Sequence, residues 1–218
     1  IKEIIHFAAS LVVPESVEQP LKYYLNNTAN TASLIQTATK YGVNKFIFSS
    51  TAAVYGEPNK EDIPVSETTR TSPINPYGSS KLFSESVIKD TAFANETFKF
   101  VILRYFNVAG ADVDGKIGQS TLNATHLIKV AAETALNKRA KMSIFGDNYD
   151  TQDGTCIRDY IHVCDLADAH LKALKYLDAN PSDIFNCGYG YGYSVKEVID
   201  TMKKVSNTDF KVDIVPRR

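Results

Sequence analysis

The sequence has no long apolar run. No stretch approaches the ~20 uninterrupted apolar residues of a membrane-spanning helix, and no basic segment followed by an apolar one opens the chain at Ile1. We therefore expect neither a membrane protein nor a secretory leader. Internal repeats, low-complexity tracts and blocks of like charge are also missing, so the chain is expected to be compact throughout.

The sequence also lacks an excess of charge of either sign. Its 218 residues include 24 Lys and Arg against 25 Asp and Glu, a net charge of −1, which gives no electrostatic footprint for nucleic acid. Only three cysteines are present, and the spacings of Cys156, Cys164 and Cys187 fit neither a disulfide framework nor a zinc site. An odd number of thiols favours a reducing cytoplasm.

The composition is that of a globular protein, with 44% hydrophobic and 22% charged residues. Strand-like apolar runs are predicted at 4–9, 45–50, 100–106, 143–145, 158–163, 184–186 and 212–215. Helical spacing is predicted for 14–41, 77–93, 127–136, 166–177 and 195–205, and a loop for 57–75. This alternation predicts a doubly wound α/β fold with a parallel sheet. Ligands bind such sheets at the carboxyl ends of the strands.

Polar side chains follow two of the predicted strands and open the helix between them. Thr51 comes directly after the second strand, and Asn107 follows the third. Between them, Tyr77 and Lys81 open a helix and lie one turn apart on one face. A phenol has a pKa of ~10, and a lysine cation ~4–5 Å away lowers it by two to three units in a partly screened site. By itself this spacing is weak evidence for catalysis, because a half-buried tyrosine beside a solvated lysine is the more common arrangement.

The order of these segments resembles the extended short-chain dehydrogenase/reductases. The segments that carry the resemblance are HFAA at 6–9, FSSTAAVYG at 48–56, PYGSSK at 76–81 and RYFN at 104–107. Within that family the closer resemblance is to enzymes that epimerise C4 of UDP-hexoses, and it extends through IFGDNY at 144–149, DGT at 153–155 and RDYIHV at 158–163. Related dehydratases usually carry an Asp-Glu couple, the acid and base for loss of water, where this chain has Ala52 and Ala53. That difference favours epimerisation.

The resemblance implies a Rossmann-type NAD-binding domain and a smaller α/β domain for the UDP-sugar. Residues 1–107 would belong to the first, with 155–178 returning to it, and 108–154 and 179–218 to the second. In the family, earlier strands and a glycine-rich loop for pyrophosphate precede the strand that His6 opens here. The chain is therefore expected to be the central part of a two-domain enzyme. Whether such a piece is active alone stays open.

The resemblance also implies roles for three residues in catalysis. Tyr77, as the phenolate, would take the proton of the sugar 4-hydroxyl while NAD takes the C4 hydride. Thr51 would relay or stabilise that proton. Lys81 would bind the nicotinamide ribose and lower the pKa of Tyr77. Leu11 stands where some members of the family carry a lysine near the cofactor phosphates, so that contact is not expected here.

The resemblance assigns further residues to binding. The expected cofactor contacts are Phe7, Ala8, Ala9, Asn26, Ser49, Tyr77, Lys81, Tyr105 and Phe106. The expected substrate contacts are Thr51, Tyr77, Asn107, His126, Leu127, Ser143, Ile144, Phe145, Arg158 and Arg218. Guanidinium groups suit the oxygens of a diphosphate, although surface pairing with Asp159 is the alternative for Arg158.

Other functions stay open at this point. They are a UDP-glucuronate epimerase, a nucleotide-sugar 4,6-dehydratase and a non-catalytic dinucleotide sensor, and a glucose-type or an N-acetylated sugar fits equally. A homodimer is implied, through the helices at 16–41 and 77–93. The glycines at 188–192 lack the helix-packing glycine of a dinucleotide loop, so no cofactor is expected there. No metal is expected either, because Asp165 is placed to cap the helix that carries Asp168 and His170.

Overall fold

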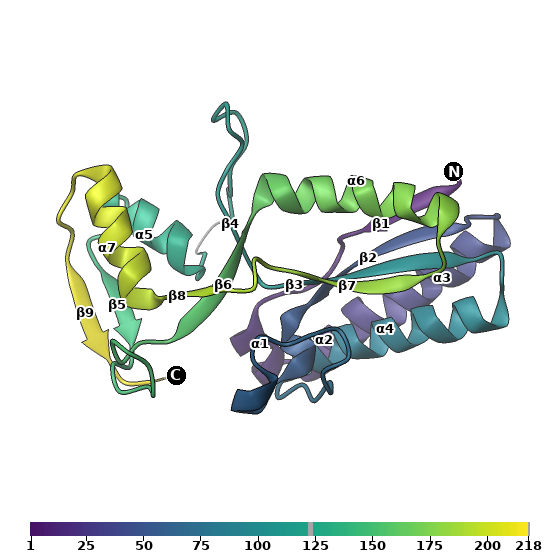
Figure 1. The fold of residues 1–218 in the computed structure, drawn as a ribbon, viewed down its shortest axis with the longest axis horizontal. Helices are drawn as coiled ribbons and strands as arrows, with labels where there is room; N and C mark the ends of the chain where they lie inside the picture. Colours follow the sequence, from purple (N-terminus) through teal and green to yellow (C-terminus); the bar gives the residue numbers. More distant parts are fainter. Residues whose placement is uncertain (122–123, 218) are drawn as a thin grey trace. The chain divides into compact units, whose positions relative to one another are not determined.

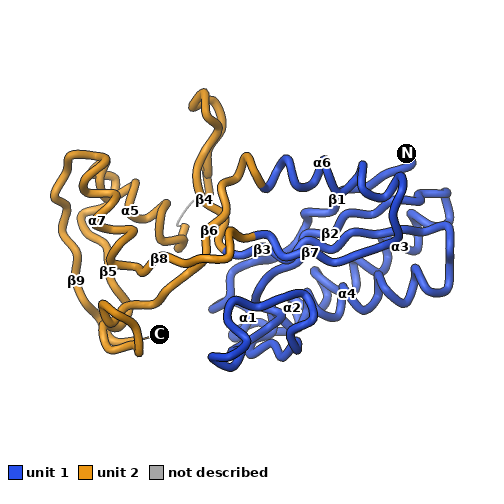
Figure 2. The backbone as a smooth tube through the Cα atoms, viewed as in Figure 1, with its two compact units in different colours: residues 1–106, 166–187 blue, residues 107–165, 188–218 orange. Residues whose placement is uncertain are grey.

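The computed structural model describes residues 1–121 and 124–217, and they form two compact units (Figure 2). Unit 1 consists of Ile1–Phe106 and Leu166–Cys187, and unit 2 of Asn107–Asp165 and the chain from Gly188 onward. Each chain crossing between the units therefore lies just past the end of a strand or at the start of a helix.

Unit 1 is built on a parallel sheet of four strands in the order β1-β2-β3-β7. These are β1 (Glu3–His6), β2 (Lys45–Thr51), β3 (Lys99–Tyr105) and β7 (Asp183–Cys187). The parallel pairing predicted from the sequence is confirmed, with Thr51 level with Tyr105 and Tyr105 level with Cys187. The carboxyl ends of these strands consequently share one edge of the sheet.

Helices cover both faces of this sheet, as a doubly wound fold requires (Figure 1). Helix α6 (Val163–Ala179) lies on one face, and α3 (Asn30–Lys40) and α4 (Pro76–Ala94) lie on the other. The core on the α3–α4 side contains Ile35, Phe46, Phe48, Ile88, Phe98, Phe100 and Ile102. Strands 46–48 and 101–103 are buried on both faces, which explains their continuous apolar sequence.

The helical stretch predicted for 14–41 is divided into four pieces. They are α1 (Val13–Glu18), α2 (Pro20–Tyr23), a π-helical turn η1 (Tyr24–Ala29) and α3. The first break lies at Gln19, where ψ is 61°, because Pro20 has no amide hydrogen and starts a new helix. The π turn accommodates one extra residue per turn and directs Asn27, which is buried, into the unit.

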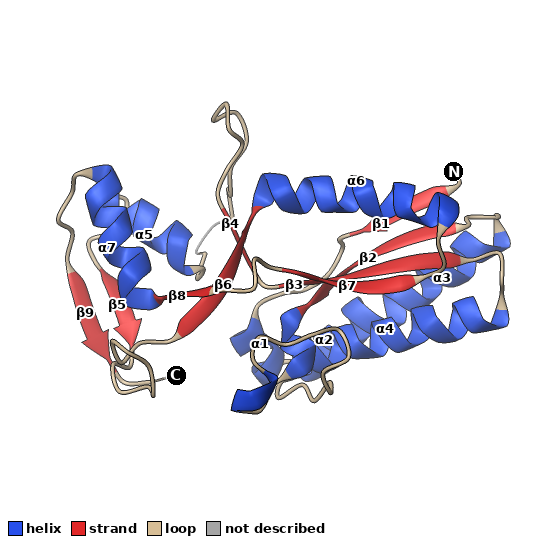
Figure 3. Cartoon of the chain, viewed as in Figure 1, coloured by secondary structure: helices blue, strands red, loops and turns tan. Residues whose placement is uncertain are grey.

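The described residues of unit 2 form two small sheets and two helices. Strands β4 (Asn107–Ala109), β6 (Ile157–His162) and β8 (Gly192–Ser194) form one sheet, and β5 (Met142–Phe145) and β9 (Val212–Val215) form the other. Helices α5 (Leu127–Ala135) and α7 (Val195–Ser206) contribute to the core around β5. The short strands β4 and β8, drawn in Figure 3, were not predicted, since three residues are too few to show a period.

The boundary between the units differs from the expected one. The segment that returns to unit 1 is 166–187 rather than 155–178. The reason is strand pairing: β7 pairs with β3 of the main sheet, whereas β6 pairs with β4 and β8 within unit 2. Among the described residues, no helix has the length and apolar character needed to span a bilayer.

Candidate active site

The first turn of α4 is fixed by three neighbouring residues. The side chain of Asn75 accepts a hydrogen bond of 2.9 Å from the amide of Gly78, and Pro76 occupies the first helical position. A Cβ on Gly78 would lie 2.7 Å from the carbonyl oxygen of Ala53, so only glycine allows the helix to approach the end of β2 this closely. This approach places the neighbouring residue, Tyr77, beside Thr51.

The side chain of Thr51 lies beside the Tyr77 phenol. Burial raises the pKa of that phenol, and the hydroxyl of Thr51 opposes this effect. Thr51 is itself buried, and its oxygen accepts a hydrogen bond from the amide of Ala53. The two hydroxyl groups are therefore brought together at the carboxyl end of β2.

Lys81 lies one turn further along α4 and contacts the same strand. Its Nζ donates a hydrogen bond of 2.5 Å to the carbonyl of Ser49 and lies 4.6 Å from the centre of the Phe48 ring. Burial lowers the pKa of Lys81 to about 8, while Glu85 acts in the opposite direction. The expected lowering of the Tyr77 pKa by Lys81 is not what the structure shows, because Lys81 is held by Ser49 and burial dominates at Tyr77.

The expected cofactor residues of unit 1 gather at one edge of the parallel sheet. Phe7, Ala8 and Ala9 follow β1, Ser49 lies near the end of β2, Tyr105 ends β3 and Phe106 follows it. The Phe7 ring is 58% exposed and its centre lies 4.7 Å from that of the His170 ring. Asn26, on the π turn, is exposed and donates a hydrogen bond to the hydroxyl of Ser10.

Tyr105 is held by a histidine that sequence analysis assigned no role at this site. His170 Nδ1 donates to the carbonyl of Leu166, which leaves the lone pair of Nε2 to accept a hydrogen bond from the Tyr105 hydroxyl. The side chain of Ser49 acts on the same phenol and opposes the rise of its pKa. Burial raises the pKa of Tyr105 and lowers the pKa of His170, so both side chains are neutral at pH 7.

The segment after β1 is fastened by two buried side chains that sequence analysis missed. Asn27 bonds both backbone groups of Ser10, at 2.8 and 2.9 Å, and donates to the Ser80 hydroxyl at 3.0 Å. Tyr23 likewise bonds both backbone groups of Val12, at 2.9 and 2.7 Å. The chain beside the expected cofactor residues is thus tied to the helix that carries Tyr77 and Lys81.

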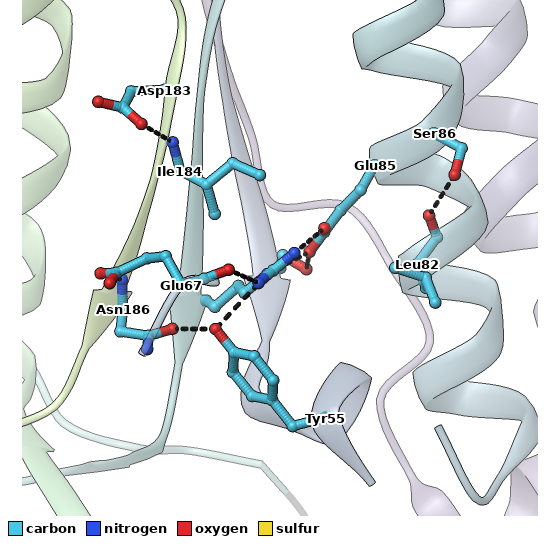
Figure 4. Close-up of polar contacts among 10 residues, drawn as sticks. Tyr55, Glu67, Leu82, Glu85, Ser86, Asp183, Ile184 and Asn186 are labelled. Carbon is cyan, nitrogen blue, oxygen red and sulfur yellow. Dashed lines mark hydrogen bonds and ion pairs between the residues drawn. The ribbon is translucent and has the colours of Figure 1, made fainter. Parts of the chain in front are cut away.

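A buried ion pair lies next to these residues and was also not predicted. Glu85 on α4 and Arg104 on β3 are 0% and 3% exposed, and Arg104 binds both carboxylate oxygens, at 3.1 and 2.7 Å. Figure 4 labels Glu85 of this pair together with the neighbouring residues Tyr55, Glu67 and Asn186. Two sequence features point to it: Glu85 lies four residues after Lys81, and Arg104 interrupts an apolar strand, where a charge requires a partner.

In unit 2, two expected substrate residues lie close to Asp159. The Asn107 amide donates to the carbonyl of Asp159 at 2.8 Å, while the exposed Arg158 donates to the carbonyl of Ile157, also at 2.8 Å. The carboxylate of Asp159 accepts the backbone amides of Tyr189 and Gly190. The glycine-rich turn at 188–192 therefore holds a carboxylate of its own chain through the amides that a phosphate would need.

The expected uridine contacts lie on β5. Ile144 is buried in the unit 2 core, Phe145 is 37% exposed, and Ser143 lies level with Asp213 of β9. At the carboxyl ends of β5 and β9 a cavity is lined by 146–148 and 214–217. The Arg217 guanidinium lies 3.9 Å from the centre of the Tyr149 ring and donates to Asn148 Oδ1 at 2.7 Å. Arg218 lies outside the described residues.

The remaining expected contacts lie at the start of α5. His126 precedes the helix, is exposed and accepts a hydrogen bond of 2.9 Å from the side-chain amide of Gln119. Leu127 packs against the core of unit 2. Within residues 1–121 and 124–217, no three His, Cys, Asp or Glu side chains come together as metal ligands would.

Comparison with known proteins gives a consistent result. Residues 1–188 match the model of the NAD dependent epimerase/dehydratase family. The chain is 54% identical over 216 residues to the UDP-glucose 4-epimerase of Azospirillum brasilense, covering 99% of this chain and 61% of the relative. The chain thus spans about three fifths of the length of that relative.

Solved structures show the same fold. The UDP-Glc/GlcNAc 4-epimerase from Campylobacter jejuni is 63% identical, with a TM-score of 0.83 over 100% of this chain and 65% of its own. A UDP-glucose 4-epimerase from Brucella ovis in complex with NAD is 42% identical, with a TM-score of 0.95 over 100% of this chain and 66% of its own. The Rossmann-like α/β fold expected from the sequence is thereby confirmed.

Proposed function

The chain belongs to the NAD dependent epimerase/dehydratase family, and on that premise we propose that the protein inverts C4 of a UDP-hexose. The observation that carries this proposal is the side chain of Thr51 beside Tyr77 with Lys81 one turn away, at the carboxyl ends of parallel strands. Ala52 and Ala53 follow directly, so this turn offers no carboxyl group for loss of water. Epimerisation does not need such a carboxyl group.

The residues at the edge of the unit 1 sheet fit the nicotinamide half of NAD. Phe7 offers an exposed aromatic face, Ala8 and Ala9 beside it have small side chains, and Lys81 supplies a buried ammonium group at the end of β2. NAD, when bound, accepts a hydride from the sugar carbon and returns it. Tyr105 is kept neutral and oriented by His170, which suits a residue that contacts a cofactor without exchanging protons.

The chemistry assigned to this chain's own residues is proton transfer at the sugar 4-hydroxyl. The Tyr77 oxygen takes the proton as C4 is oxidised and gives it back after the 4-keto sugar has turned in the pocket. Thr51 donates a hydrogen bond to that oxygen and thereby stabilises its anion. Because burial raises the pKa of Tyr77, its anion needs stabilisation beyond that from Thr51, and in the ligand-free structure Lys81 does not supply it.

Unit 2 is the proposed binding site for the uridine diphosphate. Phe145 offers a partly exposed aromatic ring, a cavity lies at the ends of β5 and β9, and the side chain of Arg158 is exposed. Asn107, His126, Leu127, Ser143, Ile144 and Arg218 remain proposed contacts. Both glucose-type and N-acetylated sugars suit this proposal.

The direct test uses the full-length protein with NAD. Incubation with UDP-glucose, and separately with UDP-N-acetylglucosamine, is expected to yield the C4 epimer, detected by proton NMR. Tyr77→Phe should lower turnover by roughly 10²–10⁴-fold, because the general base is lost, while UDP-sugar binding persists. Tyr41→Phe, at an exposed tyrosine after α3, serves as the matched control and should retain full activity. Unchanged turnover in Tyr77→Phe, or a dehydrated product, would contradict the assignment.

We further propose that the protein is a cytoplasmic homodimer that acts in galactose metabolism. Val17, Leu21 and Leu25 are spaced four residues apart along α1, α2 and the π turn, and all three are more than 60% exposed. Phe83 of α4 is half exposed and stacks on Tyr24 at 5.8 Å. A second copy of this apolar surface is the proposed partner. The three cysteines are free thiols, which suits a reducing compartment.

A further inference from the structure

Three residues of α4, each one turn apart, contact three consecutive residues of β2. Tyr77 lies beside the Thr51 side chain, Lys81 donates a hydrogen bond of 2.5 Å to the Ser49 carbonyl, and Glu85 accepts one of 2.5 Å from the Ser50 hydroxyl. Positions i, i+4 and i+8 lie on one face of a helix. The proposed function uses the first two of these contacts, and the third has no role in it.

Glu85 is buried deeply enough that its charge requires compensation. Its carboxylate is fully buried, and burying such a group is costly unless it is paired and hydrogen-bonded. Arg104 meets this requirement with two parallel hydrogen bonds, the geometry for which a guanidinium is best suited. Glu85 Oε1 accepts hydrogen bonds from both Ser50 of β2 and Arg104 of β3, so one oxygen contacts both strands.

The second side of Arg104 is also occupied. Its Nη1 donates to the Tyr55 hydroxyl at 2.9 Å and to the carbonyl of Glu67 at 3.3 Å. Tyr55 in turn donates to Asn186 of β7 at 2.7 Å, as Figure 4 shows. Arg104 therefore joins α4 to three parts of unit 1: strand β3, the turn after β2 and the 57–75 loop.

We propose that the buried Glu85–Arg104 pair is a positioning unit for the proposed active site, which holds Ser50 and thereby aligns the end of β2 with Tyr77 and Lys81. Neither residue reaches the reacting atoms. Their effect passes through Ser50, whose two chain neighbours are the contacts of Lys81 and Tyr77. This inference rests on the proposed function for its kinetic consequence, but its electrostatic consequence can be measured without turnover.

That electrostatic consequence concerns the charge of Lys81. The titratable groups that interact with Lys81 are His6 from β1 and Glu85 from α4 itself. Tyr77 lies one turn away on α4, and Arg104 from β3 pairs with Glu85. Burial lowers the pKa of Lys81 to about 8, and the Glu85 carboxylate raises it. Removing the carboxylate should therefore lower this pKa further, and removing Arg104, which leaves the carboxylate uncompensated, should raise it.

The deciding experiment titrates Lys81 in ligand-free protein labelled with ¹³Cε-lysine, with its signal assigned by Lys81→Arg. In Glu85→Gln the midpoint should move to lower pH, and in Arg104→Gln to higher pH, each by roughly half a pH unit or more. If the pair had a purely structural role, the Lys81 midpoints of both variants would shift in the same direction or not shift at all. Midpoints that coincide with that of the wild type, or that move together, would overturn the inference.

A second pair of variants covers the case in which Arg104→Gln does not fold. Adding Arg104→Gln to Glu85→Gln removes the lone buried cation, so the midpoint should return upward from that of Glu85→Gln. Ser50→Ala keeps both charges and should leave the midpoint unchanged. It should nevertheless reduce kcat by roughly two- to tenfold with KM unchanged, because one hydrogen bond is lost. Wild-type protein that titrates as described but turns over no UDP-hexose would refute the proposed function alone.

Discussion

At the scale of single residues, the buried polar side chains of unit 1 are arranged so that each donor has an acceptor. The Thr31 hydroxyl donates to the carbonyl of Asn27 at 2.6 Å, so the His6 ring must supply the proton in the 2.9 Å contact between His6 Nε2 and Thr31 Oγ1. His6 lies between the rings of Phe46 and Phe48. It is therefore a neutral histidine in a core position.

His6 should make the stability of the protein depend on pH. Its pKa is lowered from 6.5 to about 4, first by burial and then by the charge of Lys81. Because the unfolded chain binds the proton more tightly, stability is complete above pH 6.5 and falls as the pH falls toward 4, by about 3 kcal/mol in all. Urea unfolding at pH 7.5 and 4.5 should show this loss in the wild type and a clearly smaller loss in His6→Gln.

The control for this prediction is His126→Gln, at an exposed histidine, which should lose as much stability on acidification as the wild type. An equal loss in wild type and His6→Gln would show that His6 is not buried in its neutral form.

At the scale of elements, the start of α4 is the feature that places the chemistry. The helix was predicted at 77–93 and is observed at Pro76–Ala94, because Asn75, Pro76 and Gly78 are local signals that can be read without knowing the fold. The 14–41 stretch shows the opposite case. Its apolar spacing is helical, yet the π turn that turns Asn27 inward depends on Ser10 and Ser80, which are distant in sequence.

Removal of the cap of α4 should weaken the fold measurably. Asn75→Ala deletes the acceptor for the amide of Gly78 and is expected to lower the free energy of unfolding by about 1 kcal/mol, measured by urea denaturation. Asn75→Asp keeps an acceptor and adds a negative charge at the helix N-terminus, so its stability should be close to that of the wild type. If Asn75→Ala and Asn75→Asp lose the same free energy of unfolding, the side-chain acceptor at this position does not stabilise the helix.

At the scale of the whole molecule, the division into two units follows strand pairing rather than chain order. The sequence shows β6 and β7 as similar apolar runs, but β7 joins the main sheet and β6 joins a sheet of unit 2. Which strand pairs with which is a long-range choice, decided by packing on both faces. For the same reason the expected return at 155–178 differs from the observed one at 166–187.

The proposed homodimer makes a prediction at this scale. Leu21→Glu places a charge in the exposed apolar surface of α1, α2 and the π turn, so the full-length protein should sediment as a monomer at concentrations where the wild type is a dimer. Val205→Glu makes the same change at an equally exposed residue of α7 and should remain dimeric. A Leu21→Glu protein that still sediments as a dimer would place the interface elsewhere.

The sequence by itself determined the fold class, because periodicity and helix caps are local properties, and the residues of the proposed reaction were predicted from its resemblance to a known family. It could not show what surrounds those residues. The contact of Lys81 with the Ser49 carbonyl, the pairing of Glu85 with Arg104 and the histidine behind Tyr105 all join residues 19 to 65 positions apart. Only tertiary structure decides such contacts, since burial removes water and each polar group must then find its partner within the folded chain.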